Sequence, residues 1–159
     1  MKWYNQNRFI RNIAEAAVQD WQDRNICLPS VTIALAIEGT CWGMYPVYRE
    51  QQCLFPRRHD GIHGYSSIYI AVRAHNTYLA TWRAPGQQRP NWENLAREHY
   101  ILTVQCLQAA EYPYSPDRGF ERAIVELIER YDLNDYDECK IPYNPLPSNL
   151  NSQAVCDKI

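Results

Sequence analysis

The sequence predicts an all-α domain, and three observations lead to this prediction. Apolar residues recur at helical spacing in five segments of the chain. There is no alternation of strand and helix patterns of the βαβ type, and no internal repeat. The chain has 159 residues, 46% apolar and 21% charged, which fits one globular domain. Two full catalytic domains, a disordered chain and a coiled coil are therefore excluded.

The first two segments predict an amphipathic helix and a central helix. Residues 7–23 carry apolar side chains on one stripe, with acidic and amide residues between them. Ser30 is expected to cap the second helix, whose interior at 31–37 is apolar on nearly every side. A helix of that composition belongs in the centre of the fold, and it ends at 38–39.

Three more helices are expected after an irregular segment. Residues 41–64 contain Pro and Gly at intervals that predict a loop, with room for a short hairpin. A serine at 66 or 67 is expected to cap the third helix, and Asn91 the fourth. Ser115–Pro116 opens the fifth helix.

The chain end differs in composition from the rest. From residue 132 onward Asn, Asp, Pro and Tyr predominate, which predicts an extended tail over the surface. We therefore divide the chain into a helical domain at 1–136 and an extended tail at 137–159. Cys139 and Cys156 in this tail are the expected disulfide pair, whereas Cys106 is expected to be a core thiol.

Charge and hydropathy exclude several partners. The net charge is −2, with no cluster of Lys and Arg, so we expect no binding to nucleic acid. The longest apolar run, 31–37, is too short to cross a bilayer, and the first residues are not followed by the apolar core of a signal peptide. We therefore expect a soluble chain without a membrane span.

Glu38 is the most informative single residue. It stands at the end of the most apolar helix, where desolvation and the negative end of the helix dipole both oppose ionisation. We expect its pKa to be raised, as a general acid working near neutral pH requires. The alternative is a solvated glutamate that only terminates a buried helix.

Glycoside hydrolysis usually needs a second carboxylate, and Glu50 and Asp60 are the candidates. Asp60 is the one that lies in a glycine-bracketed loop, although Asp-Gly is also an ordinary turn. His59 and His63 in the same loop would make half of a zinc site. The neighbouring glycines disfavour a helix-borne pair, so we expect no metal and no cofactor.

Other catalytic groups find less support. His75 and His99 both fall on expected apolar stripes, where a hydrogen-bonded core histidine is the usual case. The sequence has no G-x-S-x-G motif and no Cys beside a His, which argues against a nucleophile triad. The 12 Tyr and 5 Trp outnumber 3 Phe, and those in loops can stack on sugar faces or cover the core edge.

Several blocks resemble glycoside hydrolase family 73, the bacterial and phage N-acetylglucosaminidases. Residues 28–43, LPSVTIALAIEGTCWG, are similar to the family helix S-x-x-x-A-Q-A-x-L-E-S-G-W-G, which carries the catalytic Glu. Residues 52–55 resemble N-N-L-F, and residues 65–79 resemble Y-x-S-x-x-x-S-I-x-D-H-x-x-F-L. Tyr112 with 115–116, and then 127–133, resemble the last two motifs, Y-A-T-D-P-x-Y and I-I-x-x-Y-x-L. Five blocks in the family order are more specific than any one of them.

The chain also departs from the family pattern. Aligned without gaps to Trp42–Gly43, the family's glutamate falls on Gly39, and Glu38 stands one position earlier. One residue on a helix is a rotation of about 100°, which turns the carboxylate away from the cleft unless Cys41 is an insertion. Residues 56–64 are also shorter than the β-rich lobe of the family.

The resemblance implies a lysozyme-like α-helical fold with a reduced β-lobe. It also implies cleavage of the β-1,4 bond after N-acetylglucosamine in peptidoglycan, at the bacterial cell wall or from a phage. The site residues expected are Glu38 as proton donor, Asp60 assisting water, Tyr112 positioning the transition state, and Trp42, Phe55, Tyr65 and Tyr114 lining the glycan groove. The alternative is a degenerate relative that binds glycan, or serves a larger assembly such as a phage particle or secretion apparatus, without cleaving.

Overall fold

The computed structural model describes residues 2–56, 62–81, 83, 86, 88, 97–110, 112 and 119–138. Within these ranges the regular structure is helical and no strand occurs, so the predicted all-α class is confirmed. The elements are α1 (Lys2–Arg24), α2 (Pro29–Thr40), α3 (Pro46–Gln51), α4 (Ile68–Thr81), α5 (Tyr100–Ala109), α6 (Phe120–Arg130) and the 3-10 helix η2 (Leu133–Glu138). None of these helices is both long and apolar enough to cross a membrane.

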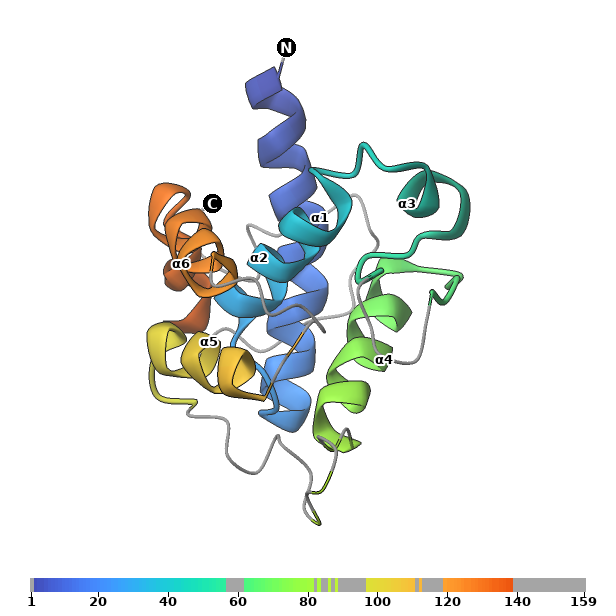
Figure 1. The fold of residues 1–159 in the computed structure, drawn as a ribbon. Helices are drawn as coiled ribbons and strands as arrows, with labels where there is room; N and C mark the ends of the chain where they lie inside the picture. Colours follow the sequence, from blue (N-terminus) through green and yellow to red (C-terminus); the bar gives the residue numbers. More distant parts are fainter. Residues whose placement is uncertain are drawn as a thin grey trace.

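Helix α2 is the centre of the fold, as its composition predicted. It contacts α1, α5, α6 and η2, and α4 packs on the other side of α1 (Figure 1). Every residue of α2 except Glu38 is buried. Because all sides of an internal helix must be apolar, the run at 31–37 shows no amphipathic stripe.

The N-terminus of α2 is capped by tertiary contact. Pro29 occupies the first turn, where its missing N–H costs nothing. Ser30 was expected to cap the helix and does not. Instead, its backbone N–H and its hydroxyl donate to the two carboxylate oxygens of Asp137, at 2.7 and 2.6 Å. This acceptor lies 107 residues further along the chain, so no local rule could find it.

Asp137 belongs to η2, a short 3-10 helix inside the stretch from residue 132 onward that was expected to be extended. Residues 133–138 form a 3-10 helix, and Leu133 and Tyr136, three positions apart, are buried on one side of it. Burial raises the pKa of Asp137 to about 6, although the hydrogen bonds from Ser30 act in the opposite direction. The remaining tail, including Cys139 and Cys156, lies outside the described residues, and the division of the chain stays a prediction.

Helix α4 confirms the predicted serine cap, whereas α5 begins later than predicted. The Ser67 hydroxyl accepts the backbone N–H of Ile70 at 3.2 Å. Residues 97–99 are not helical, and α5 starts at Tyr100. His99 is therefore exposed and caps α5, its Nδ1 accepting the N–H of Ile101 at 3.2 Å, so the expectation of a core histidine there was wrong. The cap expected at 91 and the opening at 115–116 lie outside the described residues.

The segment after α2 is more regular than predicted. It contains the short helix α3, and its described part holds no hairpin. Cys106 is half-buried rather than in the core. Cys27 is fully buried, and burial raises the pKa of its thiol to about 12, so it stays protonated at neutral pH.

Candidate functional site

The C-terminal turn of α2 carries the predicted proton donor. Glu38 is half-buried, whereas Gly39 and Thr40 beside it are buried. The Thr40 hydroxyl donates to the carbonyl of Ala36 at 2.7 Å and accepts the N–H of Gly43 at 2.9 Å, which holds the following turn against the helix. Glu38 is thus the one point at which α2 reaches solvent.

Gly39 is closed in by the segment that follows α3. A Cβ atom at this position would lie 3.0 Å from Cδ of Pro56 and 3.1 Å from the carbonyl oxygen of Leu54. A side chain at 39 would therefore force the 54–56 segment away from α2. The position that aligns with the glutamate of the family motif is thus tightly packed, and Glu38 is the only carboxylate of α2.

Phe55 and Tyr112 meet on the buried His75. The Phe55 ring stacks on the imidazole, with centroids 3.8 Å apart, and the Tyr112 hydroxyl lies 2.8 Å from Nε2 of His75. Phe55 is 4% exposed and Tyr112 is 3% exposed, so in this structure both rings pack inside the core. His75 is a hydrogen-bonded core histidine, as predicted.

The direction of each hydrogen bond at His75 follows from its neighbours. The Asn76 amide nitrogen donates to Oδ2 of Asp20 at 2.7 Å, which leaves the Asn76 oxygen 3.0 Å from Nδ1 of His75. In the neutral imidazole Nδ1 must therefore carry the proton, and Nε2 accepts the hydroxyl proton of Tyr112. The Tyr112 hydroxyl is thus fixed through a chain of buried groups that reaches α1.

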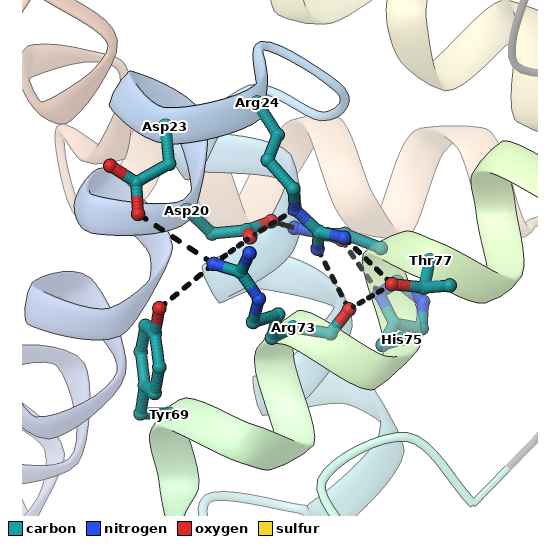
Figure 2. Close-up of polar contacts among 8 residues, drawn as sticks. Asp20, Asp23, Arg24, Tyr69, Arg73, His75 and Thr77 are labelled. Carbon is teal, nitrogen blue, oxygen red and sulfur yellow. Dashed lines mark hydrogen bonds and ion pairs between the residues drawn. The ribbon is translucent and has the colours of Figure 1, made fainter.

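Asp20 is the centre of a charged cluster that sequence reasoning missed (Figure 2). It is 1% exposed, and Oδ1 of its carboxylate lies 2.7 Å from Nε of Arg24 and 3.9 Å from a terminal nitrogen of Arg73. Arg73 also pairs with Asp23 at 3.6 Å. We expected the acidic residues of the first helix to lie between its apolar positions, which is wrong for Asp20. Its spacing, seven residues after Ile13, places it on the apolar stripe and could have revealed it.

The other aromatic candidates lie in two places. Trp42 is half-buried, and its ring lies edge-on to that of Tyr131, with centroids 4.8 Å apart. Tyr65 is also half-buried, and its backbone N–H donates to the carbonyl of Gln51 at 2.8 Å. Tyr114 lies outside the described residues, so the groove formed by the four aromatic residues stays a prediction.

The second carboxylate lies outside the described residues as well, because Asp60 and His59 fall in the gap at 57–61. No group of three His, Cys, Asp or Glu side chains that could hold a metal ion occurs in the part of the chain that the structure describes. The roles assigned to Glu38, Asp60 and the aromatic residues remain predictions.

The fold defines the class: an all-α, lysozyme-like domain. One similar solved structure is the catalytic domain of the autolysin Auto of Listeria monocytogenes, with a TM-score of 0.68 and 19% identity over 83% of this chain and 87% of that one. An N-acetylmuramoyl-L-alanine amidase of Staphylococcus aureus is also similar, with a TM-score of 0.71 and 19% identity over 87% of this chain and 45% of that one. No protein-family model and no curated protein matches the sequence.

Proposed function

We propose that this domain hydrolyses the β-1,4 bond after N-acetylglucosamine in peptidoglycan, with Glu38 as the proton donor. One observation carries the proposal: Glu38 is the only carboxylate of the buried helix α2 and its only residue that is not buried. A general acid must reach the substrate while most of its surroundings exclude water. Glu38 satisfies both conditions.

The reaction follows from two carboxylates on opposite sides of the glycosidic bond. Glu38 gives its proton to the leaving oxygen as the bond from the anomeric carbon to that oxygen breaks. Water adds to the anomeric carbon, and a carboxylate takes the proton that this water loses. Asp60 is proposed for that second role, and Tyr112 is proposed to position the transition state. Trp42, Tyr65 and Tyr114 are proposed to line the glycan groove, whereas Phe55, which was expected there too, packs on His75 in the core and does not fit a lining role in this structure.

The structural neighbours support the cell wall as the place of action but not the bond. One is the catalytic domain of an autolysin, and the other is an N-acetylmuramoyl-L-alanine amidase, whose name refers to an amide bond. A similar fold thus occurs in an autolysin and within a chain that is named as an amidase. The glycosidic bond is proposed here because of Glu38 and the ordered sequence blocks.

Lysis of purified cell walls, followed as a fall in turbidity, tests the proposal. The wild-type chain should lyse walls, and Glu38→Gln should reduce the rate about 10²- to 10⁴-fold, because an amide has no proton to give. Glu126→Gln is the matched control, since Glu126 is exposed on α6 and should leave lysis unchanged. Equal lysis by wild type and Glu38→Gln would remove Glu38 from the mechanism.

A second candidate is a domain that binds glycan without cleaving it. Gly39 favours it, because the position aligned with the family's glutamate carries no side chain and is closed by Pro56. In that case wild type and Glu38→Gln would both sediment with walls, and neither would lower the turbidity. Comparing wild type with Glu38→Gln in both assays thus distinguishes a cleaving domain from one that only binds glycan.

A further inference from the structure

A pocket of about 450 Å³ lies between α1 on one side and, on the other, α3 and the turn that follows α2. Its volume is within the range of sites that hold small ligands. Glu38 does not line this pocket, whereas Trp42, one of the proposed groove residues, does. The walls are of two kinds, one aromatic and one basic.

The aromatic rings of one wall pack closely because a glycine lies between them. The Phe9 ring lies edge-on to those of Trp42 and Tyr48, with centroids 6.2 and 5.7 Å apart. Gly43 fits between them at a φ of +75°, and a Cβ there would lie 2.9 Å from Cε1 of Tyr48 and 3.0 Å from Cε2 of Phe9. Any other residue would push the rings apart.

The turn that brings Trp42 to the pocket is strained. Cys41 and Trp42 both have left-handed backbone conformations, with φ of 49° and 60°. Such conformations are unfavourable for a residue that is not glycine, and they gather at functional sites. The strained turn ends at the wall of the pocket.

Among the residues that the structure describes, the basic wall has no counter-charge. Arg8 and Arg49 line the pocket together with the amides of Asn5, Gln6 and Asn12, and none of the described lining residues is a carboxylate. In the described part of the chain neither arginine forms an ion pair. This local excess of positive charge stands out in a chain of net charge −2. Guanidinium groups of this kind suit a carboxylate, which they can bind through two hydrogen bonds.

We propose that this pocket binds an acidic sugar, the muramic acid residue of the same glycan strand. This proposal rests on the proposed function. Muramic acid carries a lactyl carboxylate that N-acetylglucosamine lacks. Arg8 and Arg49 bind the carboxylate, the amides bind the polar groups of the sugar, and Trp42 and Tyr48 contact its apolar face. The carboxylate comes from the lactyl group of a peptide-free strand or from the attached peptide.

Ligand titrations followed by NMR test this site, with the Glu38→Gln protein as host so that cleavage plays no part. N-acetylmuramic acid should bind at least about tenfold more tightly than N-acetylglucosamine, because of the charge-assisted hydrogen bonds. The Trp42 indole signal should shift. The double variant Arg8→Ala/Arg49→Ala should abolish the difference between the two sugars. Arg11→Ala, an exposed position of α1 outside the pocket, should preserve it.

The outcomes separate this site from the proposed cleavage. If wild type fails to lyse walls while the acidic sugar binds, the cleavage proposal fails and the site stands. Equal binding of the two sugars, no effect of the double variant, or competition by inorganic phosphate at the same concentration overturns the site. Muramyl dipeptide, whose lactyl carboxyl group is an amide, then shows which carboxylate of the ligand the arginines bind. Tight binding of muramyl dipeptide assigns that carboxylate to the peptide, and weak binding assigns it to the lactyl group.

Discussion

Two pairs of arginines, each with one member on α1, have different surroundings in the fold. Arg24 and Arg73 converge on Asp20 between α1 and α4, and each has a carboxylate within 4 Å. Arg8 and Arg49 face the pocket near the other end of α1, and neither has an acidic partner among the described residues. The first pair neutralises a buried charge, and the second is left for a charge from outside. An acidic partner within the fold therefore marks a structural arginine, and the lack of one among the described residues marks a candidate binding arginine. The position of the arginine along the helix does not separate the two kinds.

Removing the buried carboxylate should have the largest effect on stability. Asp20→Ala should lower the free energy of unfolding by about 3 kcal/mol or more, because it leaves Arg24 and Asn76 without their shared acceptor. Chemical denaturation measures the change. Asp23→Ala is the matched control, because that carboxylate is 48% exposed and should cost less than about 1 kcal/mol. Equal effects of the two variants would contradict the structural role of the cluster.

Asp137 should produce a smaller, pH-dependent effect. Burial raises its pKa from 3.8 to about 6 in the folded chain, so between these values the folded state holds the proton more tightly than the unfolded state. Its contribution is therefore present in full below about pH 4 and is lost as the pH rises through 6, a change on the order of 2 kcal/mol.

Denaturation curves across this pH range measure the effect, with Asp137→Asn as the comparison. The asparagine oxygen can still accept the Ser30 N–H, but its amide does not titrate. The variant should therefore lack the fall in stability that wild type shows between pH 4 and 6. A fall of the same size in both proteins would assign the pH dependence to other groups.

The smallest effect on stability is expected at the pocket. Arg8→Ala and Arg49→Ala should each change the free energy of unfolding by less than about 0.5 kcal/mol, because both side chains are exposed and form no ion pair in the described structure. Arg24→Ala should cost clearly more, since it leaves Asp20 buried with a weaker partner. Thermal unfolding of the three variants compares them. A loss at Arg8 as large as at Arg24 would end the distinction between the two pairs.

The helices could be predicted because their signal is local. The apolar run at 31–37 was enough to place α2 in the centre of the fold, and a serine at 67 was enough to begin α4. The contacts that fix these helices were not predictable, because they join distant parts of the chain. Asp137 caps α2 from 107 residues away, and nothing near Ser30 indicates it.

The candidate site could be predicted only in part, for the same reason. Glu38 followed from its place at the end of an apolar helix. The closure of Gly39 depends on Pro56, and the environment of Tyr112 depends on His75, which lies 37 residues earlier in the chain. The arginine pocket depends on a turn with left-handed residues that are not glycine, which no sequence pattern foretells.

Analysis of the cleavage products tests the central claim most directly. Peptidoglycan treated with the wild-type chain should gain reducing ends at N-acetylglucosamine, detected by borohydride reduction and mass spectrometry, and Glu38→Gln should produce none above background. New amino groups on L-alanine without new reducing ends would contradict glycosidic cleavage. Reducing ends formed equally by both proteins would contradict the role of Glu38.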